Sequence, residues 1–134
     1  MKIYVMQLAF VSAIALWAGY AEAQTIPPPC ERYITAVNIC GADLVRLEET
    51  TKPEKAASAR ASMNDTVKTL TSGMREVVRR KGVDEAAKLC ASPAFSSQMI
   101  PQITNMMTML STGDAASEGC QDAYGRLVLP TLTQ

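Results

Sequence analysis

Apolar positions in residues 30–47 recur at alternating steps of three and four, the clearest pattern in the chain. The residues on this stripe are Cys30, Tyr33, Val37, Cys40, Leu44 and Leu47. Polar side chains such as Glu31, Asn38 and Asp43 fall between them. This spacing is typical of an amphipathic helix that buries one face. Both cysteines of the segment are therefore expected to face the core.

A second helix is predicted from the proline at position 53 to the glycine at position 82. Thr51-Lys52-Pro53-Glu54 matches a capping box with proline in the first turn. The basic triplet Arg79, Arg80 and Lys81 offsets the helix dipole in the last turn. Gly82 is a suitable end, because glycine readily leaves helical geometry. The predicted buried face consists of Ala56, Met63, Val67, Leu70, Met74 and Val77.

Two shorter helical segments follow the glycine. Asp84 is expected to cap the first, which ends at Cys90, and Ser92-Pro93 is expected to start the second. Pro101 should kink or break this second segment, because proline lacks the N–H that a helix interior needs. Its apolar face continues through Ile103, Met106, Met107 and Leu110.

A last helix is predicted between Asp114, which can cap it, and Pro130, before which it should end. It carries Cys120, Tyr124 and Leu127. No segment alternates with period two, so no strand is predicted. The expected fold is all-α, a small up-and-down bundle of three to five helices. This single domain would span residues 30–129, between a Pro-rich tether at 24–29 and a C-terminal tail at 130–134.

The chain begins with a segment typical of a secretory signal peptide. Lys2 precedes an apolar stretch, and Ala21-Glu22-Ala23 is an A-x-A cleavage site before Gln24. We expect residues 1–23 to be removed and the mature protein to be periplasmic or secreted, without stable membrane insertion. The alternative is an uncleaved membrane anchor, because residues 3–20 approach the length of a bilayer span.

All four cysteines lie beyond this segment, and in an oxidising compartment they are expected to form two disulfides. Counting helix levels in an up-and-down bundle places Cys30 near Cys90 and Cys40 near Cys120. Pairing Cys30 with Cys40 fits worst, because the helix separates their Cα atoms by about 15 Å and a disulfide spans less than about 7 Å. The favoured pairs are therefore Cys30–Cys90 and Cys40–Cys120.

The composition argues against most catalytic classes. The chain has no histidine, which removes the commonest general base and most zinc sites. It also has no C-x-x-C pair and no glycine-rich phosphate loop. The carboxylate pairs Glu48-Glu49 and Asp84-Glu85 are better explained by the helices that carry them. We expect no enzymatic activity and no cofactor, and the formal net charge of zero predicts no nucleic-acid partner.

Methionine is the one unusual enrichment. Four methionines fall close together, namely Met99, Met106, Met107 and Met109. Because thioethers are soft ligands that select Cu(I), a copper site at Met99, Met106 and Met109 is the alternative function. The spacing favours a core role, since residues 99, 103, 106 and 110 form one apolar helix face.

Two cysteine segments carry a family resemblance. Residues 30–40 place Tyr33 three positions after the first cysteine and nine residues between the two cysteines. Residues 86–90, Ala-Ala-Lys-Leu-Cys, follow a long helix rich in alanine and arginine. On these motifs the chain resembles small, uncharacterised periplasmic four-cysteine helical proteins of bacteria. The resemblance implies a bacterial envelope setting and no particular activity.

Taken together, these features predict a non-enzymatic binding or protein-interaction module that acts through a surface. After signal removal the aromatic residues are Tyr33, Phe95 and Tyr124, too few for the walls of a usual small-molecule site. Methionine and arginine are enriched at protein interfaces. The candidate patch is therefore Arg79, Arg80, Lys81, Met99, Met106 and Met109. Its partner is expected to be another envelope or secreted protein; were that partner a secreted enzyme, the chain would be an inhibitor or immunity-type protein.

Overall fold

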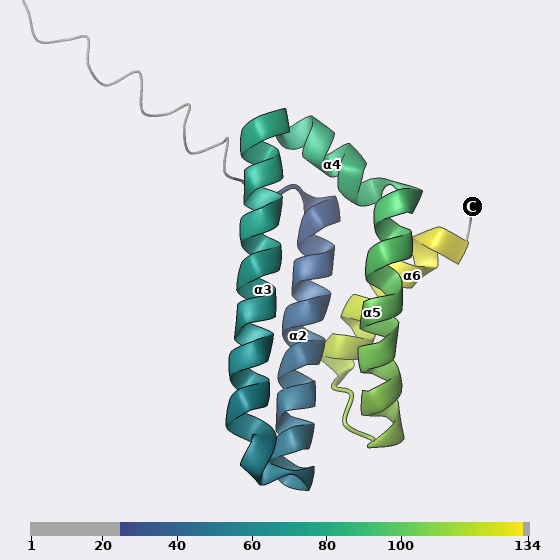
Figure 1. The fold of residues 1–134 in the computed structure, drawn as a ribbon. Helices are drawn as coiled ribbons and strands as arrows, with labels where there is room; N and C mark the ends of the chain where they lie inside the picture. The colour runs from purple at the N-terminus through teal and green to yellow at the C-terminus, as the bar shows by residue number, and fades with distance from the viewer. Residues whose placement is uncertain (1–24, 133–134) are drawn as a thin grey trace, which may run out of the picture.

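The computed structural model describes residues 25–132, which contain five helices and no strand. These helices are α2 (Pro28–Thr51), α3 (Pro53–Lys81), α4 (Val83–Ala91), α5 (Pro93–Thr112) and α6 (Glu118–Leu132). α2 and α3 form an antiparallel pair, α4 crosses the end of this pair, and α5 runs back beside α2 (Figure 1). The all-α prediction is confirmed. The predicted signal peptide at 1–23 lies outside the described residues.

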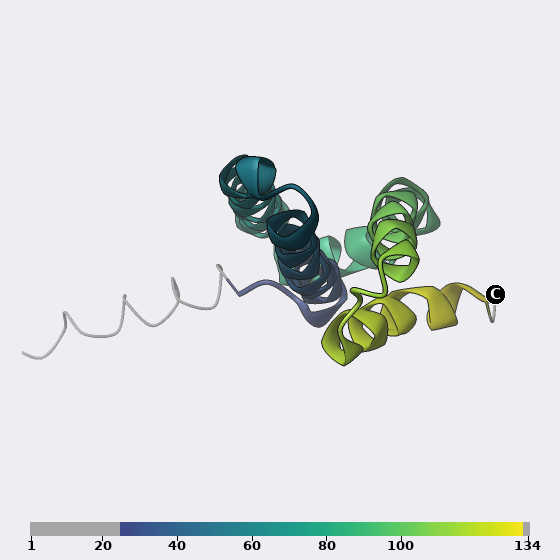
Figure 2. The same cartoon turned by 90° about the horizontal axis from the view of Figure 1, so that it is seen from below.

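α2 is the central element of the bundle. It contacts each of the other four helices. Figure 2 shows α3 and α5 diverging on one side of α2, while α6 crosses on the other side. Because neighbours cover several faces of α2, burial extends beyond the predicted stripe to Ala36, Gly41, Asp43 and Val45.

Two disulfides tie this central helix to its neighbours. Cys30 pairs with Cys90 of α4, with Cα atoms 5.1 Å apart, and Cys40 pairs with Cys120 of α6, with Cα atoms 4.8 Å apart. Both predicted pairs are confirmed. Each disulfide lies in a hydrophobic cluster, one containing Tyr33, Met74 and Ile103 and the other containing Leu110.

Several helix starts differ from the predictions. α2 begins at Pro28, so two of the three prolines occupy its first turn, where proline's missing N–H costs no hydrogen bond. Thr51 does not cap α3; it ends α2 and its hydroxyl donates to the carbonyl of Leu47 at 2.8 Å. Asp84 does not cap α4, which begins at Val83 after Gly82 turns the chain with φ of 88°. The predicted cap at Ser92 is confirmed, since its side chain accepts from the N–H of Phe95 at 3.3 Å.

Pro101 does not break α5, and α6 does not end before Pro130 as predicted. α5 continues through Pro101 to Thr112, and α6 continues through Pro130 to Leu132. Pro101 and Ser97 are both exposed, so water can replace the N–H donor that the carbonyl of residue 97 loses. Asp114 does not cap α6 either, because it occupies the preceding turn with φ of 50°.

Within residues 25–132, no helix combines the length and apolar character that a bilayer crossing requires.

Candidate functional site

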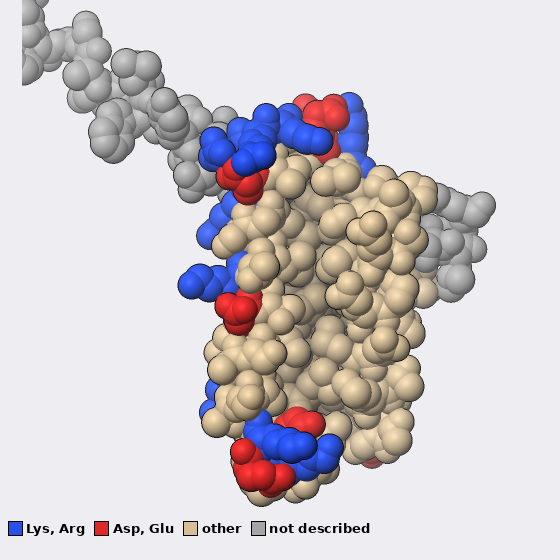
Figure 3. All heavy atoms as spheres, in the orientation of Figure 1, with Lys and Arg blue, Asp and Glu red and all other residues tan. Residues whose placement is uncertain are grey.

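An open groove runs between α3 and α5, with α2 as its floor. No Cα atom of α3 lies within 8 Å of one of α5, because the two helices diverge from α2. We call the resulting hollow, which has a volume of about 550 Å³, the α3–α5 groove. It is visible as the depression between the two upright helices in Figure 3. Its apolar lining consists of Val37, Met63, Leu70, Met99, Ile103 and Met106.

The walls of the groove carry very little charge. α5 contains no Lys, Arg, Asp or Glu. Asp65 is the one ionisable side chain among the described lining residues, and the polar remainder is Thr66, Thr69 and Gln102. Charged side chains on this face gather along the outer edge of α3 and at the two ends of the molecule (Figure 3). The groove is therefore suited to holding an apolar surface, and its lining offers no acid–base pair for catalysis.

The predicted methionine cluster points in several directions. Met99 and Met106 line the α3–α5 groove. Met107 packs on the opposite side, with its Sδ 3.2 Å from the Sγ of Cys120. Met109 is 53% exposed and is not part of the groove lining. The structure instead brings Met63 of α3 to the two groove methionines, an arrangement signalled in the sequence by its place on the predicted buried face of α3.

The basic triplet lies apart from the groove, at the end of α3 next to α4. Arg79 and Arg80 each form an ion pair with Glu76 at 2.6 Å. Hydrogen bonds from Arg79 and then Arg80 lower the pKa of Glu76 to about 2. None of the three basic residues lines the groove. The predicted patch is therefore not one surface. Met99 and Met106 belong to the groove, whereas the basic triplet forms a separate helix end whose positive charge is partly neutralised by Glu76.

A second hollow of about 660 Å³ lies between the start of α2, the end of α4, the first half of α5, and α6. We call it the proline cavity, because its apolar lining is Pro29, Pro93, Ile100, Pro101 and Leu127. The charged residues in its lining are Arg32 and Arg126. Sequence reasoning missed this cavity, since its residues come from segments far apart in the chain and no local motif joins them.

No protein-family model, curated protein or solved structure matches this chain.

The carboxylate pairs considered for catalysis lie at opposite ends of the molecule. Glu49 forms an ion pair with Arg60, and Glu85 forms one with Lys88 at 2.7 Å. Hydrogen bonding to Lys88 lowers the pKa of Glu85, so the Glu85 carboxyl is ionised at neutral pH and holds no proton to donate. The part of the chain described by the structure also contains no group of three or more His, Cys, Asp or Glu residues that could hold a metal ion.

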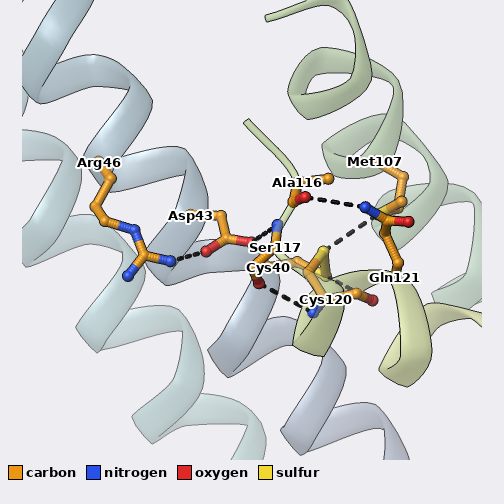
Figure 4. The surroundings of a disulfide bond; sticks show 8 residues. All are labelled: Cys40, Asp43, Arg46, Met107, Ala116, Ser117, Cys120 and Gln121. Atoms are coloured by element: carbon orange, nitrogen blue, oxygen red, sulfur yellow. Dashed lines mark hydrogen bonds and ion pairs between the residues drawn. A yellow bond between two sulfur atoms is a disulfide. The ribbon is translucent and has the colours of Figure 1, made fainter. Parts of the chain in front are cut away.

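Asp43 is fully buried, although the sequence placed it on the polar side of its helix. Figure 4 shows its carboxylate between α2 and the start of α6, beside the Cys40–Cys120 disulfide. Oδ2 accepts from the backbone N–H of Ser117 at 2.8 Å, and Oδ1 accepts from Arg46. Ser117 in turn caps α6, because its Oγ accepts from the N–H of Cys120 at 3.2 Å.

Burial raises the pKa of the Asp43 carboxyl, but the hydrogen bonds from Ser117 and Arg46 outweigh this effect and leave the pKa below its ordinary value of 3.8. Asp43 is thus ionised at neutral pH. With both oxygens engaged, it fastens α6 to α2 and is a structural group.

Proposed function

We propose that this chain is a non-enzymatic binding protein of the envelope or the secreted space, and that it holds an apolar segment of a partner protein in the α3–α5 groove. The observation that carries the proposal is the groove itself. Two helices stand apart on a common floor and present apolar side chains, including Met63, Met99 and Met106, to one hollow. An uncovered apolar hollow of this kind is typical of an interaction site.

The most suitable occupant is an amphipathic helix laid along the groove with its apolar face inward. The groove lining runs from Met99 to Met106 on α5 and from Met63 to Leu70 on α3. At about 1.5 Å per residue each wall is about 10 Å long, which matches about two turns of a partner helix. Methionine side chains are flexible and adapt to irregular surfaces. Asp65 at the α3 wall favours a lysine or arginine at the edge of the partner's apolar face.

Two disulfides support an oxidising compartment, because thiols are kept reduced in the cytosol. The predicted signal peptide supports the same location. Intact-mass analysis of the native protein should then show a chain that begins at Gln24; retention of residues 1–23 would instead indicate a membrane-anchored form.

The groove is tested by site-specific photo-crosslinking in the native envelope. A benzophenone side chain at Thr66 or Gln102, which line the groove, should crosslink one specific protein. The same probe at the exposed control position Ser58, outside the groove, should not. Met106→Glu should abolish the groove crosslinks by placing a charge in the apolar lining. Equal crosslinking from groove and control positions would overturn the proposal.

The basic triplet is tested separately with the Arg79→Glu/Arg80→Glu variant. If the triplet is part of the same interface, the crosslinks from Gln102 should weaken. If only the groove binds, they should persist.

A Cu(I) site is the second candidate, because three thioethers, those of Met63, Met99 and Met106, line one groove. A competition titration with a colorimetric Cu(I) chelator distinguishes it from the protein-binding groove, which predicts no tight copper binding. Stoichiometric binding that is lost in Met63→Leu/Met106→Leu, and kept in Met109→Leu, would favour copper. Each replacement nearly conserves volume and should cost less than about 1.5 kcal/mol of stability.

A further inference from the structure

The proline cavity has rigid apolar walls. Pro29, Pro93 and Pro101 contribute rings that have almost no rotamer freedom to lose, and Ile100 and Leu127 complete the apolar surface. Cys90, which is joined to Cys30 of α2, also lines the cavity. A preformed hollow of about 660 Å³ lies within the size range of small-molecule sites, and little ordering is needed to fill it.

The hydroxyl groups of the cavity are already engaged. The Tyr33 hydroxyl shares a hydrogen bond with Ser96 Oγ at 3.0 Å, and Ser96 Oγ donates to the carbonyl of Ser92 at 3.1 Å. Ser97 Oγ donates to the carbonyl of Ala94 at 2.9 Å. These bonds leave the two arginines of the lining as the donors available to a ligand.

The arginines give the cavity a positive character. Its described lining contains Arg32 and Arg126 and no carboxylate. Arg126 forms an exposed ion pair with Asp122 at 2.9 Å. Arg32 has no ion pair with any residue in the range 25–132. A planar guanidinium without a partner, beside an apolar wall, matches the geometry of a carboxylate that carries an apolar tail.

We infer that the proline cavity is a second binding site, separate from the α3–α5 groove, for a small aliphatic carboxylate such as a medium-chain fatty acid. The tail lies against the three prolines, Ile100 and Leu127, and the head group pairs with Arg32 and Arg126 at the rim. This site goes beyond the proposed protein-binding function, because the groove and the cavity share no described lining residue.

Isothermal titration of the purified, oxidised protein with dodecanoate tests this assignment. Dodecanoate should bind with one-to-one stoichiometry, and dodecanol and dodecyltrimethylammonium should bind at least tenfold more weakly. Arg32→Gln should weaken dodecanoate binding about tenfold, as expected for loss of a charge-assisted hydrogen bond, and should leave dodecanol binding unchanged. Ile100→Glu should abolish the binding of both dodecanoate and dodecanol.

Two matched controls locate the ligand. Arg75→Gln removes an exposed arginine of α3 that lies outside the cavity, and it should leave dodecanoate affinity unchanged. Met106→Glu blocks the groove and should also have no effect, so that failure of the groove proposal and failure of this one remain distinguishable.

The inference is overturned if dodecanoate does not bind, if dodecanol binds equally well, or if Met106→Glu rather than Ile100→Glu abolishes binding. Tighter binding of dodecyl phosphate than of dodecanoate would show that a carboxylate is the wrong head group.

Discussion

At the scale of single residues, Asp43 joins two helices through one ionised carboxylate. Its oxygens accept from the N–H of Ser117 and from Arg46, and the side chain is completely buried. Removal of the carboxylate leaves the Ser117 N–H without its acceptor and a small void at the junction of α2 and α6. Both effects act on the folded state, because the carboxylate is hydrated in the unfolded chain.

Asp43→Ala is expected to lower the free energy of unfolding by about 2 kcal/mol, the scale of a lost buried hydrogen bond to a charged group. Arg46→Gln is the matched control. The Arg46 side chain is 66% exposed, so its loss should cost less than about 1 kcal/mol. Urea denaturation at neutral pH measures both. A larger loss for Arg46→Gln than for Asp43→Ala would contradict this assignment.

The ionisation of Asp43 should also make the free energy of unfolding depend on pH. Its folded-state pKa lies below the ordinary value of 3.8, so its contribution to stability is present above pH 3.8 and is lost as the pH falls through the folded pKa. Asp43→Asn, which cannot ionise, should lose less stability than the wild-type chain over this acidic range. Parallel acid-induced declines in both proteins would show that Asp43 does not carry the effect.

Two glycines are predicted to respond in opposite ways to alanine. Gly73 lies inside α3, and a Cβ added there meets no atom within 4 Å. Gly73→Ala should therefore raise the free energy of unfolding by about 0.5–1 kcal/mol, the difference in helix propensity. Gly82 has φ of 88°, so Gly82→Ala should lower it by about 1–3 kcal/mol through backbone strain. Thermal or urea denaturation of the two variants tests the pair.

At the scale of elements, the apolar stripe of α2 predicted the helix and its buried cysteines, because burial follows periodicity. Counting helix levels across the predicted turns gave the cysteine pairing, because that depends on helix length. The helix ends were predicted less well. The sequence could not show that Pro101 lies on an exposed face. It also could not show that Ser117, which caps α6, is held by a hydrogen bond from its own N–H to Asp43 of α2. Local cap and proline rules do not include such tertiary contacts.

The candidate site, too, could be predicted only where it depends on the pattern within one segment. Met99 and Met106 could be selected from sequence because they share one helix face with Ile103. The contribution of Met63, the separation of the basic triplet and the whole proline cavity depend on how helices diverge from α2. No spacing within one segment encodes that divergence.

Gly41 of α2 lies directly against the Met63 side chain of α3. A Cβ at this buried position would collide with the Sδ of Met63 and lie 2.6 Å from its Cγ. Gly41→Leu should therefore displace Met63 and lower the free energy of unfolding by about 1–3 kcal/mol, as overpacking does. The matched control, Gly73→Leu on open helix surface, should not destabilise. Equal destabilisation by both would exclude packing at Gly41 as the cause.

At the scale of the whole molecule, the two disulfides join the central helix α2 to α4 and α6, the two shortest of the described helices. Among the described helices, α6 contacts α2 and α5, whereas α4 contacts α2, α3 and α5. The bridges join residues 60 and 80 positions apart in the sequence. In the chain-entropy model such loops contribute nearly equal amounts, about 4 kcal/mol each. The free energy of unfolding of the whole protein therefore cannot distinguish the roles of the two disulfides. The hydrogen-exchange protection of individual helices can.

Replacing Cys40 and Cys120 with alanine should expose the backbone amides of α6 to hydrogen exchange before those of α3, because α6 then keeps only its packing on α2 and α5 and the Asp43–Ser117 hydrogen bond. Replacing Cys30 and Cys90 should instead release α4 and the first turns of α2 and α5, which border the proline cavity. Amide exchange measured by mass spectrometry on both double variants resolves these patterns. Loss of protection in the same helices of both variants would mean that the bundle opens as one unit, and that neither bridge has a local role.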